Sequence, residues 1–189
     1  SSAFRLLGST QAGSQGGVQA CVAMDALLRS FRGLPPQRML LMSSGLATTK
    51  IKKAFAELLR ERRPEGDPKV LYVIDAAVGD GHDGRQTYNA FVSQMTQFGV
   101  TRVVFVELRN TTQRQLSRML QDVDCLYVEG GNTFYLRYYM HASGFDDLVR
   151  PLIRYDGVVY AGVSAGSIAA GATVATAFWK GWDSPGFGT

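Results

Sequence analysis

The chain has 189 residues, a length that fits one domain of ordinary size. Hydrophobic residues make up 46% and charged residues 19%, which is a globular composition and excludes a disordered or collagen-like chain. The net charge of +4 is spread along the sequence, and no apolar run approaches ~20 residues. We therefore expect neither a nucleic-acid partner nor a membrane-spanning segment.

Residues 1–37 differ from the rest and are expected to form an N-terminal extension, with the domain at 38–189. Residues 9–17 have the composition of a flexible linker, and residues 18–31 fit a short amphipathic helix. The segment contains Arg and Ser and few acidic residues, a composition that resembles the remnant of a transit peptide; an ordinary N-terminal extension is the alternative. The two widely spaced cysteines, Cys21 and Cys125, fit a reducing compartment. We expect a cytoplasmic protein, with an organelle matrix or stroma as the other option.

From residue 38 onward, short apolar runs alternate with segments of helical periodicity. Strands are expected at residues 39–42, 70–74, 103–106, 126–128 and 158–161. Helices are expected at residues 48–63, 88–98, 112–120, 133–140, 146–155 and 164–170, with Pro151 interrupting the fifth.

The apolar runs are continuous, which is typical of strands that are buried on both faces. This pattern predicts an α/β fold: a doubly wound, mostly parallel sheet with helices on both faces. Ligands of such folds bind outside the carboxyl ends of the strands. The segments that follow the strands are therefore of most interest, and residues 75–85 are expected to be a mobile surface loop.

The motif Gly162-Val163-Ser164-Ala165-Gly166 follows a predicted strand and opens a predicted helix, which is the context of a nucleophile elbow. In such a turn the serine has a positive φ and exposes its hydroxyl. The N–H of Ala165 then points to where an oxyanion would form. The alternatives are an ordinary serine cap or an anion-binding turn.

The segment Glu129-Gly130-Gly131-Asn132-Thr133 also lies between a strand and a helix. Its glycines allow the backbone to come close to a ligand, and either Asn132 or Thr133 can cap the helix. Next to a nucleophile elbow, Gly130 or Gly131 offers the second oxyanion donor. A plain turn is the alternative. Glu129 and Asp75 both end strands at this edge, where either carboxylate can bind a substrate amine.

Together, the segments 127–134 and 160–167 resemble the peptidase E and cyanophycinase family of serine peptidases, and peptidase E, the aspartyl dipeptidase, more closely. The resemblance covers about residues 38–185. It implies a fold like that of class I glutamine amidotransferases and a catalytic triad of Ser, His and Glu or Asp. It also implies hydrolysis of dipeptides after an N-terminal Asp, without a metal or other cofactor.

By this resemblance Ser164 is the nucleophile, and Gly130, Gly131 and Ala165 form the oxyanion hole. Asn132, Thr133, Glu129 and Asp183 are expected to contact the substrate; Asp183 falls in a stretch, 176–185, that resembles the family's loop after the nucleophile helix. An acidic substrate side chain requires a cation, for which Arg109 and Arg137 are the candidates. The expected partner is a small peptide, and a homodimer is left open.

The family's catalytic histidine lies beyond the nucleophile, whereas no histidine follows Ser164 here. We therefore expect the chain to lack the C-terminal part of the family domain. His82, between Asp80 and Asp83, is a possible substitute base, and His141 is a weaker one. Two other functions remain open: a catalytically dead homologue that binds or supports a partner, and a flavodoxin-like anion-binding module.

Overall fold

The computed structural model describes residues 24, 27, 30, 33–181 and 183. Contacts divide the chain into two units, Ser1–Pro36 and Gln37–Thr189. In the first unit, Met24, Leu27 and Ser30 are helical, while the expected linker at 9–17 and the rest of the expected helix at 18–31 lie outside the described residues. The second unit contains the sheet.

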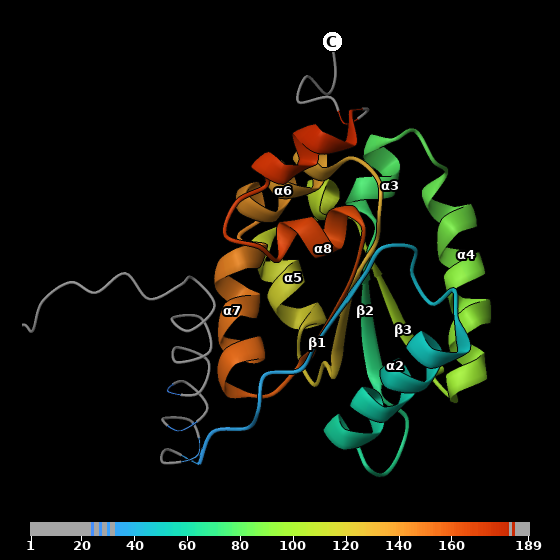
Figure 1. Ribbon diagram of the computed structural model, residues 1–189, viewed down its shortest axis with the longest axis vertical. Coiled ribbons are helices and arrows are strands. Elements are labelled where there is room, and N and C mark those ends of the chain that lie inside the picture. The colour runs from blue at the N-terminus through green and yellow to red at the C-terminus, as the bar shows by residue number, and fades with distance from the viewer. Residues whose placement is uncertain (1–23, 25–26, 28–29, 31–32, 182, 184–189) are drawn as a thin grey trace, which may run out of the picture. The chain divides into compact units, whose positions relative to one another are not determined.

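Five strands form a parallel sheet in the order β1-β5-β4-β2-β3 (Figure 1). Their bounds are β1 Met39–Met42, β2 Lys69–Val73, β3 Arg102–Val106, β4 Cys125–Val128 and β5 Val159–Val163. Every pairing is parallel, and the four residues of β4 are all buried. The expected parallel sheet is therefore confirmed.

Helices cover both faces of the sheet, as expected. On one face, α2 (Thr49–Arg62) and α4 (Gly84–Met95) bury Phe55 and Phe91 against the strands. The opposite face is covered by α5 (Gln113–Met119), α6 (Thr133–Ala142), α7 (Phe145–Tyr155) and α8 (Ala165–Ala169). Figure 1 shows these two layers on either side of the strands.

Residues 75–85 are not a loop throughout, contrary to expectation. They contain helix α3 (Asp75–Gly79), and α4 already begins at Gly84, capped by Asp83, whose side chain accepts a hydrogen bond from Gln86 N at 2.9 Å. Helix α3 has no amphipathic period because it is short and its first three residues are all buried. The 3₁₀ helix η1 (Thr96–Phe98) lies within the helix expected at 88–98, whereas the 3₁₀ helices η2 (Leu108–Asn110) and η3 (Ala175–Lys180) were not expected.

Pro151 does not interrupt α7, contrary to expectation. The proline is exposed, so water can hydrate a carbonyl that is left without its N–H partner. Phe145 and Val149 are buried on the opposite side of the helix, and this packing holds the helix together across the proline. Tertiary burial thus outweighs the local cost of proline.

The direction in which successive strands are added to the sheet reverses between β2 and β4. Strand β2 leads through α4 to β3 at one edge, whereas β4 leads through α6 and α7 to β5 on the other side. In doubly wound folds, the carboxyl end of the sheet at such a switch point forms a crevice in which ligands bind. The segments that follow β2, β4 and β5 meet at this end.

Candidate active site

Ser164 has the backbone conformation expected of a nucleophile elbow. It lies between β5 and α8 with φ 44° and ψ −103°, and it is one of two non-glycine residues with positive φ among those described. Such a conformation is strained and persists only where neighbouring contacts enforce it. One of these contacts is the hydrogen bond from Ser164 N to Met42 O at 2.8 Å. The expected positive φ of Ser164 is confirmed.

The two glycines of the elbow allow its turn to be tight. A Cβ on Gly162 would lie 2.7 Å from the backbone of Gly166, and a Cβ on Gly166 would lie 2.3 Å from Val128 O. Both distances are too short for a real side chain. The elbow is therefore packed directly on β4, the strand that leads to the second motif.

Ser167 ties the elbow to the end of β1, a role that the sequence reasoning missed. Its Oγ lies 3.0 Å from Met42 N, from which it accepts, and 2.9 Å and 2.7 Å from the carbonyl oxygens of Met42 and Gly162. No pattern in the sequence distinguishes this serine from others in a helix. Its contacts hold β1, β5 and the first turn of α8 together beneath Ser164.

The glycine turn after β4 lies beside the elbow. A Cβ on Gly130 would be 3.3 Å from the Cβ of Ser164. Gly131 has φ 138°, and a Cβ there would be 2.1 Å from Ala76 O. Asn132, not Thr133, caps α6: its side chain accepts a hydrogen bond from Tyr135 N at 3.0 Å. The structure thus brings the two motifs together, as the oxyanion-hole hypothesis requires.

Glu129 spans the switch point between β2 and β4. Its Oε2 accepts a hydrogen bond from Tyr72 Oη at 2.7 Å, and its Oε1 accepts one from Gly130 N at 2.9 Å. Burial, followed by the charge of Glu129, raises the pKa of Tyr72 well above its ordinary value, so Tyr72 remains a neutral donor. The sequence reasoning missed Tyr72, although its hydroxyl stands out in an apolar strand.

A lysine and an aspartate near the end of the described chain close over the glycine turn. Asp183 Oδ2 accepts hydrogen bonds from Thr133 N and Lys180 Nζ, both at 3.0 Å, and Lys180 also donates to Gly131 O at 3.0 Å. Burial acts to raise the pKa of Asp183, but the hydrogen bonds from Lys180 and Thr133 outweigh it and lower the pKa. Lys180 was not among the expected site residues.

Asp75 is not available to bind a substrate amine, which corrects one of the two carboxylate hypotheses. Its side chain is fully buried and accepts hydrogen bonds from Leu108 N at 2.8 Å and Arg109 N at 3.1 Å. Burial raises the pKa of Asp75 to about 6, although these two hydrogen bonds oppose the shift. Asp75 therefore anchors η2 and does not face substrate.

The raised pKa of Asp75 predicts a specific pH dependence of stability. A carboxyl whose pKa rises from 3.8 to about 6 on folding binds its proton more tightly in the folded state. Its contribution is complete below pH 3.8 and is lost as the pH rises through 6. Relative to Asp75→Asn, the free energy of unfolding of the wild type should fall by about 2 kcal/mol between pH 4 and pH 7. Urea unfolding of both proteins measures this; a constant difference would contradict it.

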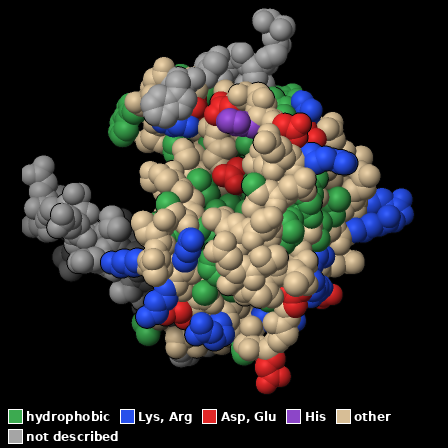
Figure 2. Space-filling model, turned by 90° about the vertical axis from the view of Figure 1, so that its right-hand side faces the viewer, with side chains coloured by type: hydrophobic (Ala, Val, Ile, Leu, Met, Phe, Trp, Pro, Cys, Tyr) green, Lys and Arg blue, Asp and Glu red, His purple; other side chains and the backbone are tan. Residues whose placement is uncertain are grey.

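The two histidines do not contact Ser164 in the part of the chain that is described. His82 is exposed after α3, and its backbone N–H donates a hydrogen bond to Ala77 O at 3.0 Å. Burial, followed by the charge of Asp183, raises the pKa of Asp80, and Lys180 and His82 oppose this shift, so these groups are electrostatic neighbours. Figure 2 shows a histidine side chain beside acidic groups on the face that carries α4. His141 is exposed in the last turn of α6.

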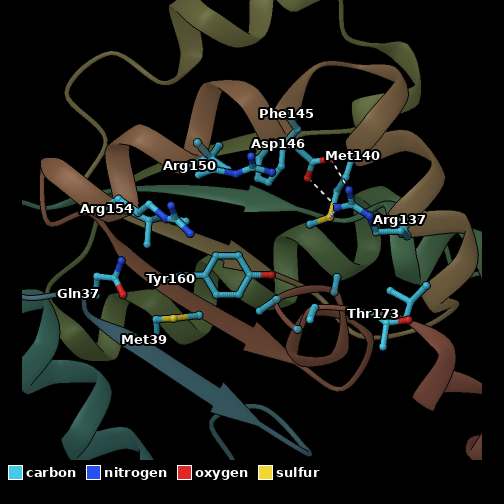
Figure 3. A pocket seen from close by; sticks show the side chains of 17 residues that line it. Gln37, Met39, Arg137, Met140, Phe145, Asp146, Arg150, Arg154, Tyr160 and Thr173 are labelled. Atoms are coloured by element: carbon cyan, nitrogen blue, oxygen red, sulfur yellow. Dashed lines mark hydrogen bonds and ion pairs between the residues drawn. The ribbon is translucent and has the colours of Figure 1, made fainter. Parts of the chain in front are cut away.

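The two arginines expected near the nucleophile are engaged elsewhere. Arg109 pairs with Glu107 and donates to Tyr135 Oη at 3.1 Å. Arg137 donates to Asp146 Oδ1 at 2.7 Å. This pair lines a pocket of about 710 Å³ near α7 and β5 (Figure 3), and Ser164 is not part of its lining. The size of this pocket therefore does not by itself identify the functional site.

Within the described residues, no helix is both long and apolar enough to cross a membrane. The same residues contain no group of three or more His, Cys, Asp or Glu side chains placed to hold a metal ion. A ligand can reach the residues of the elbow and the glycine turn that are partly exposed, namely Ser164, Gly130, Gly131 and Glu129. The arrangement offers a strained serine, backbone donors beside it and one carboxylate.

Two solved structures share this fold. A candidate peptidase E protein from Listeria monocytogenes EGD-e has a TM-score of 0.59 and 23% identity, covering 78% of this chain and 67% of its own. A peptidase from an acI-B1 Actinobacterium has a TM-score of 0.56 and 18% identity, covering 69% of this chain and 55% of its own. At these identities the likeness shows the fold alone. No curated protein matches the chain.

The family model for peptidase family S51 matches residues 39–183. The match runs from the first residue of β1 to Asp183, and so includes the elbow, the glycine turn and the segment that closes over it. It covers well over half of the sequence. The chain therefore belongs to peptidase family S51.

Proposed function

We propose that this protein is a serine peptidase that hydrolyses small peptides, with Ser164 as the nucleophile. The observation that carries the proposal is the strained φ of 44° at Ser164, directly beside Gly130. Strained backbone of this kind gathers at catalytic turns, and family membership makes a peptidase the natural reading.

In this mechanism Ser164 Oγ attacks the scissile carbonyl as a general base takes its proton, and a tetrahedral oxyanion develops. The N–H groups of Ala165 and of Gly130 or Gly131 donate to it. Collapse of this tetrahedral intermediate expels the peptide amine, which takes up the proton, and water then releases the acyl group from Ser164. Asn132 and Thr133 are buried, so we assign them to shaping the glycine turn. Asp183 fixes that turn from above through Thr133 N, and Glu129 is the carboxylate open to substrate.

The preferred substrate in this proposal is a dipeptide with an N-terminal Asp, as the resemblance to peptidase E implies. The test compares hydrolysis of Asp-Leu and Ala-Leu by the full-length protein. Ser164→Ala should lower kcat/KM by at least ~10³-fold, because it removes the attacking atom. Equal rates for the two dipeptides would contradict the aspartyl preference alone. Hydrolysis that survives in Ser164→Ala would contradict the nucleophile.

A second function, peptide binding without turnover, is favoured by one observation: in the described part of the chain, neither His82 nor His141 contacts Ser164. A serine hydroxyl is a poor nucleophile unless a base takes its proton. Calorimetric binding of Asp-Leu to a full-length protein that releases no Asp or Leu would select this function. Release that depends on Ser164 would exclude it.

A further inference from the structure

Among the described residues, the Glu129 carboxylate has no cationic partner. It is only partly exposed, and its two hydrogen-bond donors, Tyr72 Oη and Gly130 N, are both neutral. Nowhere in the described part of the chain does a Lys, Arg or His form an ion pair with it, whereas the nearby Asp183 is paired with Lys180. A charge withdrawn from water is stabilised by an opposite charge. The site therefore favours a ligand that brings a cation.

The same carboxylate accepts a hydrogen bond from a backbone donor that is a candidate for the oxyanion hole. Gly130 N donates to Glu129 Oε1 at 2.9 Å, and Gly130 lies against Ser164. While this hydrogen bond persists, Gly130 N–H cannot donate fully to an oxyanion. Unless Glu129 Oε1 moves away, the oxyanion hole lacks one of its candidate donors.

The chemistry of an N-terminal residue connects these two observations. Its α-ammonium is separated from its own carbonyl carbon by a single Cα, so the two atoms are ~2.5 Å apart. A carboxylate that receives the ammonium must therefore lie beside the oxyanion turn. Glu129 immediately precedes Gly130 in the chain and meets this requirement.

We propose that Glu129 is a latch: its carboxylate holds Gly130 N–H until the free amino terminus of the substrate displaces it. In this proposal, which rests on the proposed function of Ser164, the incoming α-ammonium takes Glu129 Oε1 from Gly130 N–H. Gly130 is then free to donate to the oxyanion. A peptide with a blocked amino terminus leaves the latch closed, so the site selects for amino-terminal residues.

Tyr72 is the positioning residue of this latch. Its buried hydroxyl holds Oε2 at 2.7 Å from the neighbouring strand, β2. Because burial keeps Tyr72 neutral, this donor remains in place when the other oxygen changes partner. The carboxylate can therefore exchange Gly130 N–H for an ammonium without leaving the site.

The first arm of the test measures binding without chemistry. In full-length Ser164→Ala, calorimetry compares Asp-Leu with N-acetyl-Asp-Leu. The free amine should bind at least ~10-fold more tightly, and adding Glu129→Gln should remove this advantage. Glu107→Gln is the matched control, since Glu107 follows β3, the edge strand on the far side of β2 from β4, and pairs with Arg109; it should keep the advantage. No advantage for the free amine, or one that survives Glu129→Gln, would overturn the proposal.

The second arm measures the latch itself, with Ser164 intact. The rate of Ser164 labelling is compared for two diphenyl α-aminoalkyl phosphonates, one with a free amine and one N-acetylated. Glu129→Ala should slow the free-amine probe yet accelerate the acetylated probe, because Gly130 N–H is released. A merely structural role would slow both. If Glu129→Ala does not increase the rate of labelling by the acetylated probe, the latch proposal is wrong. If neither probe labels Ser164, the proposed function is wrong, and the calorimetric comparison still tests whether Glu129 binds the amino terminus.

Discussion

Gly131→Ala is expected to destabilise the protein by about 3 kcal/mol or more. A Cβ at this position would lie 2.1 Å from Ala76 O and 2.7 Å from Ala77 N, both of them backbone atoms that no rotamer change can move. Ala76 O also accepts the hydrogen bond from Asn132 N at 2.9 Å, so relief of the clash breaks the link between α3 and the glycine turn. Urea unfolding followed by circular dichroism measures the loss.

Gly66→Ala is the matched control for this substitution. Gly66 also has a positive φ, 87°, but a Cβ there would meet nothing within 4 Å. Its loss should be about 1–2 kcal/mol, the cost of a left-handed conformation for a residue with a side chain. Equal losses in the two variants would show that the close approach of Gly131 to α3 contributes nothing.

A polypeptide of residues 1–189 is expected to hydrolyse Asp-Leu slowly and to be accelerated by added imidazole. General-base assistance is worth ~10²–10⁴-fold, and no histidine follows Ser164 in this sequence. Free imidazole that enters the open site can take the proton of Ser164. The rescued rate should rise with pH through the pKa of free imidazole, as the neutral ring becomes available. Steady-state release of Leu measures the rate with and without imidazole.

His82→Ala is the control for this rescue. His82 is exposed and shows no contact with Ser164 in the described structure, so its removal should leave both rates unchanged. Rapid hydrolysis without imidazole that is lost in His82→Ala would show that the loop after α3 supplies the base. In that case Asp80 or Asp83, which lie on either side of His82 in the sequence, would be the carboxylate that orients the ring.

Continuous apolar runs were enough to predict the sheet, because strands buried on both faces cannot alternate polar and apolar residues. The helices that pack along the sheet have a clear period, and their positions agree with the structure to within a few residues, apart from the start of α4. Helix α3 was missed for a physical reason. Its burial comes from contact with the glycine turn some 55 residues later, not from an amphipathic face.

The motifs indicated where Ser164 and Gly130 would meet, since both follow neighbouring parallel strands. The contacts that complete the site could not be predicted in the same way. The bond between Tyr72 and Glu129 depends on the register in which β2 pairs with β4. The hydrogen bond between Lys180 and Asp183 depends on the path of η3, a segment whose apolar residues follow neither the period of a strand nor that of a helix.

The most direct test of the account is covalent labelling of the full-length protein with a fluorophosphonate, followed by peptide mass spectrometry. We expect a single modified serine, Ser164, and no modification in the Ser164→Ala variant. Ser167, three residues further along and hydrogen-bonded to Met42 and Gly162, should remain unmodified. Labelling at Ser167 or another serine, or labelling that persists in Ser164→Ala, would contradict the assignment of Ser164 as the nucleophile.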